Sequence, residues 1–266
     1  MNSLSVEKRM ELLHRAFGIT AEADQKVIAL AGNPNTGKST VFNALTGLNQ
    51  HTGNWPGKTV GNAQGSFTHN NQSFLLVDLP GTYSLLPNSV DEQVARDFIC
   101  FGRPDVTLVV VDATALERNL NLALQVMEIT DQVVLCVNLM DEAKRKGVQV
   151  DIEGLSKKLG VPVVATAARQ KQGLQELKDQ LFNVVTGAIR PSPLLLHYSE
   201  EVEQAICELE VKLAPLLKGL LKPRWVALRM LDGDTTLLQD IERYMTDAAL
   251  PEHPVSREVS PSWPQA

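Results

Sequence analysis

The sequence has few cysteines, few aromatic residues and no excess of basic charge. Its 266 residues include three cysteines, Cys100, Cys136 and Cys207, and none of them forms a CxxC pair. This sparse, odd count argues against a disulfide framework or a cysteine-based zinc site, and it fits a reducing compartment. Lys and Arg number 25 against 31 Asp and Glu, which gives a net charge of −6. A chain that mainly grips duplex nucleic acid carries a basic surplus, so we expect no nucleic-acid partner.

Long apolar runs are absent as well. The longest, such as 108–111 and 194–196, are far shorter than the roughly 18 residues that span a bilayer. Charges interrupt the apolar positions of the N-terminus, so no signal peptide is expected. The hydrophobic fraction of 44% still allows a sizeable core. We expect a soluble, cytosolic chain of one large or two smaller domains, which can be a piece of a longer protein.

Short apolar runs alternate with segments of helical periodicity between residues 26 and 188. Such runs are typical of strands buried on both faces, and their alternation with helices predicts right-handed crossovers. The sequence thus predicts an α/β fold, with a mostly parallel sheet and helices on both faces. Residues 65–69 precede the Asn70-Asn71 turn and are expected to form an antiparallel edge strand. The predicted strands are 27–31, 74–77, 106–111, 133–137 and 161–165, and the predicted helices are 39–48, 91–101, 116–130, 152–159 and 174–185.

Two prolines, Pro191 and Pro193, end this pattern, because proline breaks helices. Beyond them, helical periodicity over 200–217 and 237–245 predicts a small all-helical domain. A short amphipathic helix is expected over 4–17. The predicted division is an N-terminal helical extension over 1–25, a nucleotide-binding domain over 26–188, a helical domain over 189–250 and a flexible tail or linker over 251–266.

The strongest motif is GNPNTGKS, from Gly32 to Ser39, which matches GxxxxGK[ST] between a predicted strand and a predicted helix. Its glycines let the backbone wrap a phosphate chain, with N–H groups pointing at it. Lys38 is expected to reach the β- and γ-phosphates, and the Ser39 hydroxyl to ligate Mg²⁺. A chance match in a glycine-rich turn has odds of roughly 1 in 100 in a chain of this length. The motif therefore predicts nucleotide binding.

A second motif predicts which base is bound. Asn138 and Asp141 form an NxxD pattern at the end of a predicted strand. A carboxylate there accepts hydrogen bonds from guanine N1–H and N2–H₂, a donor pair that adenine lacks. NxxD alone is more often a helix N-cap, but a phosphate loop about 100 residues upstream favours guanine. Backbone N–H groups of 166–168 are candidates to contact the guanine carbonyl.

Two further segments belong to this set. Asp78 and Gly81 lie in DLPG after a predicted strand, where Asp78 is expected to hold Mg²⁺ and the Gly81 N–H to sense a γ-phosphate. A plain turn is the alternative. The Gly- and Pro-rich segment 53–61 is expected to be a mobile loop whose Thr59 covers Mg²⁺. Trp55 within it is either a partly exposed anchor or a functional residue.

The order and spacing of these elements resemble the translation-factor-like branch of Ras-like GTPases over residues 26–188. GNPNTGKST, NWPGKTVG, DLPGTYSL and NLMDEA are similar to the N-terminal cytosolic portion of the ferrous iron transporter B family. The stretch 222–234, KPRWVALRMLDGD, resembles that family's small helical domain, which acts like a guanine-nucleotide dissociation inhibitor. The resemblance implies a P-loop Ras-like G domain followed by a small all-α domain.

The resemblance also implies a GTPase that regulates or drives Fe²⁺ uptake from the cytoplasmic face of the inner membrane. Its ligands would be GTP or GDP, Mg²⁺ and a K⁺ ion held by Asn35, a residue that is alternatively a plain turn former. Its partners would be the membrane permease domain of the same protein, a small accessory protein and further copies of the chain. Thr82 stands where Ras carries its water-orienting Gln, and Arg103 and Arg118 are expected on the surface. We therefore expect slow hydrolysis, on the order of 10⁻⁴ to 10⁻² s⁻¹.

These motifs and the resemblance together define the predicted site. The predicted catalytic residues are Asn35, Lys38, Thr59 and Gly81. The predicted metal ligands are Ser39, Thr59 and Asp78 for Mg²⁺ and Asn35 for K⁺. The predicted GTP contacts are Gly32, Asn33, Pro34, Asn35, Thr36, Gly37, Lys38, Ser39, Thr40, Gly57, Lys58, Thr59, Asp78, Gly81, Asn138, Asp141, Thr166, Ala167 and Ala168.

Two other functions remain open. In the first, the chain is a GTP-dependent binding module whose loops 53–61 and 81–90 change shape for a protein partner, and hydrolysis is incidental. In the second, it is a soluble ribosome- or tRNA-associated GTPase, which would need a basic appendage, whereas 200–250 is rich in Glu and Asp. The five histidines are dispersed without metal-ligand spacing, so no iron site is expected within this chain.

Overall fold

A seven-stranded mixed sheet forms the centre of the computed structural model, which describes residues 12–22, 24–47, 50–86, 88–217 and 219–245. The strands are β1 (Lys26–Gly32), β2 (Gln50–Asn54), β3 (Gly61–His69), β4 (Gln72–Asp78), β5 (Val106–Asp112), β6 (Val133–Asn138) and β7 (Val163–Ala165). Their spatial order is β2-β3-β4-β1-β5-β6-β7. The strands β4, β1, β5, β6 and β7 pair in parallel, and β3 and β2 extend the sheet antiparallel. The predicted fold class is confirmed.

Helices cover both faces of this sheet. They are α2 (Lys38–Thr46), α3 (Val90–Phe101), α4 (Leu116–Ile129), α5 (Met140–Arg145), α6 (Ile152–Leu159), α7 (Leu174–Val185), α8 (Glu200–Leu217), α9 (Pro223–Leu231) and α10 (Thr235–Met245), with short 3₁₀ turns η1 (Ala113–Ala115) and η2 (Ala168–Gln170). One buried cluster holds side chains of α2 and α7, such as Phe42 and Leu177. The cluster on the other face holds side chains of α3 to α6, such as Phe98 and Leu122. These helices match the five predicted before residue 188, with the short α5 in addition.

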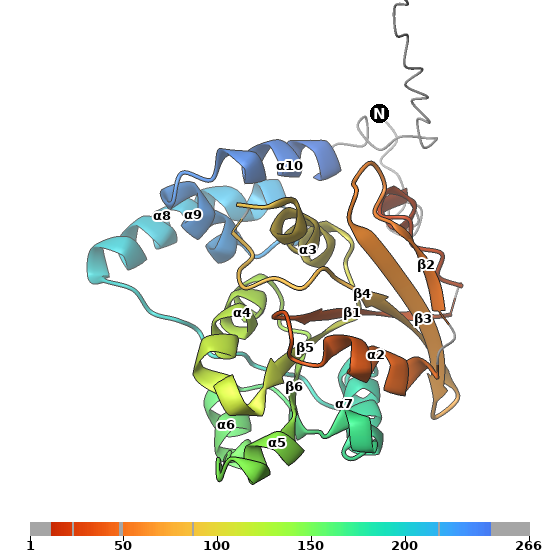
Figure 1. Ribbon diagram of the computed structural model, residues 1–266. Helices are drawn as coiled ribbons and strands as arrows, with labels where there is room; N and C mark the ends of the chain where they lie inside the picture. The colour runs from red at the N-terminus through yellow and green to blue at the C-terminus, as the bar shows by residue number, and fades with distance from the viewer. Residues whose placement is uncertain (1–11, 23, 48–49, 87, 218, 246–266) are drawn as a thin grey trace, which may run out of the picture.

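The helices α8, α9 and α10 form the predicted all-helical part, and Figure 1 shows them grouped beside α3, away from α2 and α7. Trp225 of α9 and Leu237 of α10 are buried in the same hydrophobic cluster as Phe98 of α3. The helical part therefore shares a core with the sheet domain. Periodicity did not predict α9, which begins with Pro223 at its first position, where proline's missing N–H costs nothing.

A buried ionic cluster lies at the contact between α3 and α10. The Arg96 guanidinium, 1% exposed, donates from Nη2 to Asp97 Oδ1 at 2.8 Å and to Asp240 Oδ2, and its Nη1 lies 3.5 Å from Asp234 Oδ2. Burial raises the pKa of Asp97 to about 6, an effect that Arg96 opposes and Asp240 reinforces. One cation thus faces three carboxylates across this contact.

The carboxyl ends of the parallel strands meet at one edge of the sheet. Leu30 of β1 is paired with Asp78 of β4 on one side and with Leu108 of β5 on the other. Asp112 of β5 is in turn paired with Asn138 of β6. Gly32 and Asp78 therefore end adjacent strands, and Asn138 ends β6 on the far side of β5. All three lie at the same edge, where open α/β sheets bind their ligands.

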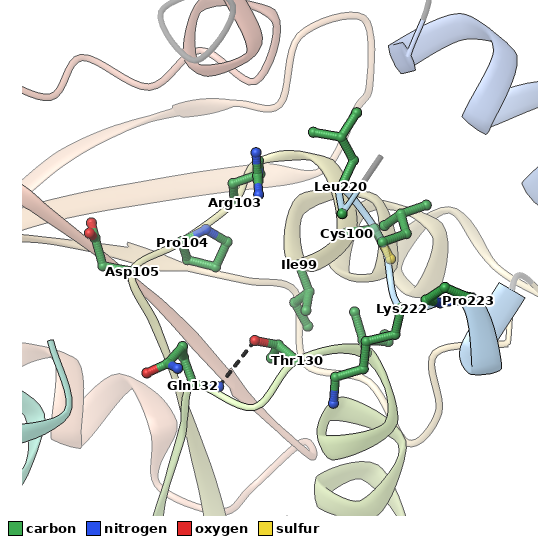
Figure 2. Close-up of a pocket in the computed structure, with 13 residues that line it drawn as sticks. Ile99, Cys100, Arg103, Pro104, Asp105, Thr130, Gln132, Leu220, Lys222 and Pro223 are labelled. Carbon is green, nitrogen blue, oxygen red and sulfur yellow. Dashed lines mark hydrogen bonds between the residues drawn. The ribbon is translucent and has the colours of Figure 1, made fainter. Parts of the chain in front are cut away.

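A cavity of about 620 Å³ lies at the opposite edge, between the end of α3, the end of α4 and the segment that leads into α9. Figure 2 shows Arg103 and Pro104 on one side of its lining and Lys222 and Pro223 on the other. Arg103 is therefore remote from the edge where β1 ends, and it is partly buried.

Two predictions about 50–69 are wrong. Residues 65–69 belong to β3, but β3 is not an edge strand, because β2 pairs outside it. β2 reads QHTGN and has no apolar alternation, so hydropathy could not mark it. Trp55 is not partly exposed either, since it is 2% exposed and lies 5.4 Å from Phe98 and 6.4 Å from Phe17 between ring centroids.

Other boundaries differ in smaller ways. The strand predicted over 161–165 begins at Val163, and the predicted helix 237–245 begins at Thr235. Of the helix predicted over 4–17, the structure shows 12–16 as helical, and 4–11 lie outside the described residues. The predicted tail 251–266 lies outside them too. Between α7 and α8 the chain is not helical, and Ser192 N–H donates to Gly160 O at 2.9 Å, so this linker runs back against the end of α6.

Candidate nucleotide-binding site

The predicted phosphate loop is a tight turn between β1 and α2. Two of its residues have positive φ angles, 67° at Asn35 and 80° at Gly37, and Gly37 is the N-cap of α2. A Cβ atom on Gly37 would lie 2.4 Å from Asn138 Nδ2, so only glycine fits there. The Thr36 hydroxyl, which is buried, donates to Asn33 O at 2.9 Å and holds the turn closed. The free N–H groups at the start of α2 are an anion-binding feature.

The buried Asn33 side chain has no partner within the part of the chain that the structure describes. Both its amide nitrogen and its amide oxygen lie out of solvent without a hydrogen bond. Pro34, Asn35, Ser39 and Thr40 are exposed around it. The turn therefore has an open outer rim and one buried amide that a ligand or a local rearrangement can satisfy.

The Lys38 ammonium points to the end of β4. It forms an ion pair with the Asp78 carboxylate and donates to Leu79 O at 2.7 Å. Burial raises the pKa of Asp78, and the neighbouring Lys38 charge opposes the rise. The structure thus places together the predicted phosphate ligand and the predicted metal ligand, and each neutralises the other.

The DLPG segment packs against the phosphate loop. The Leu79 N–H donates to Leu30 O at 3.0 Å, and the Thr82 N–H donates to Gly32 O at 3.3 Å. Gly81 lies beside Pro34, since a Cβ on Gly81 would lie 3.5 Å from the Pro34 nitrogen. Gly81 is therefore beside the turn, as expected for a residue that contacts the end of a phosphate chain.

The Asn138 amide joins two loops that are far apart in sequence. Its Nδ2 donates to Thr36 O at 3.0 Å, and its Oδ1 accepts from Thr166 Oγ1 at 3.0 Å and from the Ala168 N–H at 3.1 Å. The Thr166 hydroxyl also lies 3.1 Å from Cys136 Sγ. All four hydrogen bonds are buried, so they fix the phosphate loop relative to the loop that follows β7.

Asp141 lies at the start of α5, near the same loop. The Met140 N–H donates to Thr166 O at 3.1 Å, which docks α5 on the loop, and Gln170 Nε2 donates to Asp141 Oδ2 at 3.1 Å. Ala167 beside it is buried. The five predicted base-side residues, Asn138, Asp141, Thr166, Ala167 and Ala168, therefore lie around one place at the carboxyl edge of the sheet.

The structure does not bring 57–59 to the phosphate loop. Thr59 is exposed, and Lys58 Nζ donates to Gln93 Oε1 of α3 at 3.1 Å. Figure 1 shows the β2–β3 connection near α3, apart from the start of α2. Nor is this segment a free loop, since 53–54 belong to β2 and the Trp55 N–H donates to Val60 O at 2.9 Å. Gly57, Lys58 and Thr59 stay predicted ligands that require this segment to move.

Sequence reasoning missed two residues near these loops, Gln170 and Cys136, and one at the contact between α3 and α10, Arg96. Gln170 is a polar residue in an exposed turn, and Cys136 is one apolar position of a buried strand, so neither carries a signal. Arg96 is a charged residue within a predicted helix, which is the usual pattern of a surface position. Its burial depends on carboxylates about 140 positions away, such as Asp240. Trp55 was singled out, but its contacts with Phe17 and Phe98 arise only in the fold.

Within the described residues, no group of three or more His, Cys, Asp or Glu side chains is placed to hold a metal ion. No helix there has the length and hydropathy that a membrane span needs. The donors near the phosphate loop are the Ser39 hydroxyl and the Asp78 carboxylate. Hard oxygen donors of this kind suit Mg²⁺, which usually takes one or two protein ligands and completes its shell with phosphate and water.

Comparisons with known proteins identify relatives of the chain. A family model described as ferrous iron transport protein B matches residues 26–181, and one described as FeoB cytosolic helical domain matches residues 198–257. The Fe(2+) transporter FeoB of Escherichia coli strain K12 is 38% identical over 211 residues, which cover 78% of this chain and 27% of the relative. A Porphyromonas gingivalis Fe(2+) transport protein A/Fe(2+) transporter FeoB fusion protein is 40% identical over 211 residues, which cover 78% of this chain and 25% of the relative. The chain thus spans about a quarter of the length of these curated relatives.

Solved structures agree as well. The cytosolic domain of the T. maritima FeoB iron transporter in a GDP form superposes with a TM-score of 0.76 at 37% identity, over 85% of this chain and 88% of that one. The GMPPNP form of the same domain superposes with a TM-score of 0.73 at 36% identity, over 86% of this chain and 88% of that one. The cytosolic domain of L. pneumophila FeoB superposes with a TM-score of 0.74 at 35% identity, over 85% of this chain and 91% of that one.

Proposed function

The chain belongs to the ferrous iron transport protein B family, and we propose that it binds GTP and hydrolyses it slowly as the nucleotide-binding part of such a transporter. The observation that carries the proposal is the Asn138 amide, which ties the phosphate loop to the loop after β7. One side chain holds both loops, and α5 with Asp141 is docked on the second loop. A phosphate chain on the first loop and a guanine base at Asp141 therefore fit a single ligand.

The residues of the phosphate loop supply most of the binding. The N–H groups at the start of α2 receive the phosphates, and Lys38 leaves Asp78 to reach the β- and γ-phosphates. Asp78 and Ser39 are then free to hold Mg²⁺. When bound, Mg²⁺ neutralises phosphate charge and favours departure of the γ-phosphoryl group. The Gly81 N–H lies where it can report a γ-phosphate, and Thr59 completes the site after the 55–60 turn detaches.

Hydrolysis by this arrangement is slow, because the chain supplies little beyond positioning. Thr82, which follows Gly81, is buried, and its N–H is bound to Gly32 O. The Arg118 guanidinium is stacked on the Tyr83 ring, 4.5 Å from its centroid, and Arg103 lies at the far edge of the sheet. We expect turnover on the order of 10⁻⁴ to 10⁻² s⁻¹ without a partner.

A K⁺ ion beside Asn35 is part of the proposal. Asn35 is exposed at the rim of the phosphate loop and has a left-handed backbone conformation. Replacement of K⁺ by Na⁺, or the substitution Asn35→Ala, is expected to lower the hydrolysis rate while GDP affinity stays within about threefold. Equal rates in K⁺ and Na⁺ would remove K⁺ from the mechanism and leave Asn35 as a turn former.

The whole protein's activity is also a proposal, because this chain spans only about a quarter of its curated relatives. We propose that the nucleotide state regulates Fe²⁺ uptake by a membrane permease domain, with this part at the cytoplasmic face of the inner membrane. The fusion relative joins a transport protein A to the transporter, which supports a small accessory protein as a partner. Further copies of the chain are a second candidate partner. The acidic composition of the chain disfavours nucleic acid and a ribosome-associated function.

A GTP-dependent switch with incidental hydrolysis is the second candidate, and the buried Thr82 in place of a water-orienting residue favours it. Transport by the full-length protein separates the two candidates. If hydrolysis drives transport, Lys38→Ala should stop uptake, and Asn35→Ala should slow it in proportion to the loss of hydrolysis. If binding alone suffices, only Lys38→Ala should lower uptake.

The binding proposal is tested by titration with fluorescent GDP and ADP. The wild-type chain is expected to prefer GDP by at least about 100-fold, because adenine leaves Asp141 without its donors. Lys38→Ala should weaken GDP binding at least tenfold, whereas Lys26→Ala, which removes a half-exposed lysine paired with Asp105, should not. Equal affinity for the two bases would contradict the proposal.

A further inference from the structure

The Asp141 carboxylate is held by a residue that no motif includes. Gln170 Nε2 donates to Asp141 Oδ2 at 3.1 Å, across 29 positions of sequence. Within the described part of the chain, the Asp141 carboxylate forms no other hydrogen bond. Both residues line a cavity of about 1060 Å³, so the pair borders open space and is not sealed in the core.

The backbone around Asp141 is fixed without Gln170. The Met140 N–H donates to Thr166 O, and the Thr166 N–H donates to Val137 O at 2.8 Å. Ala167 and Gln172 exchange two backbone hydrogen bonds of 3.2 and 3.3 Å, which close the turn that carries Gln170. These contacts place the Cα atom of Asp141, but they leave rotation of its carboxylate free.

The two alanines of the loop after β7 cannot restrict that rotation. Ala167 and Ala168, the nearest residues of the loop after β7, have no polar side-chain atom, so the donor has to come from further along the turn. A carboxylate has about four acceptor positions, and a single amide N–H uses one of them. Gln is also neutral, so it orients the carboxylate and leaves its negative charge for a ligand.

We propose that Gln170 is a positioning residue for guanine recognition, which sets the Asp141 carboxylate so that it accepts from guanine N1–H and N2–H₂ together. This inference rests on the proposed guanine-nucleotide function. Two parallel hydrogen bonds need the plane of the carboxylate to match the edge of the base, whereas one hydrogen bond tolerates rotation. Gln170 therefore contributes to selectivity for guanine more than to affinity for phosphates.

Inosine diphosphate is the probe that separates these effects, because it keeps N1–H and lacks the 2-amino group. The ratio of its dissociation constant to that of GDP measures the second hydrogen bond. In Gln170→Ala this ratio should fall by about 3- to 10-fold relative to wild type, since a hydrogen bond to a charged group is partly lost. Gln170→Glu, which keeps the length but offers no donor, should lower it at least as much.

Gln172→Ala is the matched control, because it removes an exposed glutamine two positions away that lines the same cavity and holds the turn through its backbone. The ratio of its inosine diphosphate and GDP dissociation constants should equal that of wild type. The inference would be overturned if this ratio is unchanged in Gln170→Ala, or if it falls as much in Gln172→Ala as in Gln170→Ala.

Asp141→Asn tests the underlying function separately. This variant should lose GDP and gain xanthosine diphosphate, whose base presents an acceptor where guanine has its amino donor. If Asp141→Asn loses GDP and gains xanthosine diphosphate, the guanine site is supported. If Gln170→Ala then keeps the wild-type ratio of the inosine diphosphate and GDP dissociation constants, the proposed role of Gln170 is wrong. If Asp141→Asn leaves GDP binding unchanged, the guanine site itself is wrong, and with it the inference.

Discussion

The Lys38 ammonium and the Asp78 carboxylate form an ion pair, although each is a predicted ligand of a different group. Lys38 begins α2, and Asp78 ends β4, the strand that pairs directly with β1. Because both side chains are largely buried, neither charge can be left alone at low cost. A nucleotide with Mg²⁺ can separate them, since phosphate then neutralises Lys38 and the metal neutralises Asp78.

Removal of the Asp78 charge should therefore separate nucleotide binding from hydrolysis. Asp78→Asn is expected to lower Mg²⁺-dependent GTP hydrolysis by about 10- to 100-fold, because a neutral amide is a poor Mg²⁺ ligand. GDP affinity without Mg²⁺ should hold or increase, since Lys38 no longer leaves an ion pair to bind phosphate. Phosphate release and GDP titration measure the two effects.

Asp131→Asn serves as the control, because it removes a half-exposed carboxylate that is paired with Lys222. A wild-type rate of hydrolysis by Asp78→Asn would contradict the assignment of Asp78 as a Mg²⁺ ligand.

Trp55 should report the movement of the 55–60 turn. Its indole is buried between Phe17 and Phe98, far from water, and Thr59 can reach a metal at the phosphate loop only if this turn detaches. In a variant where Trp225 and Trp263 are Phe, a GTP analogue with Mg²⁺ should shift the fluorescence emission of Trp55 to longer wavelength. GDP should not. An emission spectrum that both nucleotides leave unchanged would show that Thr59 does not join the site.

Arg96 should be essential for stability, because it is the cation that faces three carboxylates between α3 and α10. Arg96→Met keeps much of the volume but removes the cation that is paired directly with Asp97, Asp234 and Asp240. We expect a loss of about 3–5 kcal/mol in the free energy of unfolding at pH 7, measured with denaturant. Arg145→Met, at a side chain 73% exposed, should change it by less than about 1 kcal/mol. Similar losses in the two variants would contradict the role of the buried cluster.

Asp97 should make stability depend on pH between about 4 and 6. Burial raises its pKa from 3.8 to about 6 in the folded chain, so the folded chain binds more protons than the unfolded chain in this range. The contribution of Asp97 to stability is therefore largest below pH 4 and falls as pH rises to 6, by at most about 3 kcal/mol. Asp97→Asn keeps an oxygen acceptor for Arg96 and should remove this fall. The free energies of unfolding of the wild type and of Asp97→Asn at pH 4.5 and 6.5 measure this fall. An equal fall in the two proteins would contradict the role of Asp97.

The phosphate loop could be predicted from sequence because a phosphate cradle needs contiguous residues of fixed type. Gly37 shows why the spacing is strict, since any side chain there would collide with Asn138. The sheet could be predicted for a similar reason: buried parallel strands read as short apolar runs. Which of these residues touch a nucleotide stays a prediction that the experiments above address.

The remaining features depend on contacts between distant parts of the chain. The edge strand β2 is exposed and has no apolar pattern, and Trp55 is buried by residues about 40 positions away on either side. Gln170 acquires its role only because the strand order places its turn beside α5. Local sequence carries none of this information, since an exposed Gln and a helical Arg look the same wherever their partners lie.

The central claim is that this chain is a slow hydrolase of GTP, and phosphate release under multiple turnover tests it most directly. With Mg²⁺ and K⁺, the wild-type chain should release phosphate from GTP at about 10⁻⁴ to 10⁻² s⁻¹, release none from ATP, and lose the activity in Lys38→Ala. Release from ATP at the same rate, or a rate that Lys38→Ala leaves unchanged, would contradict the account.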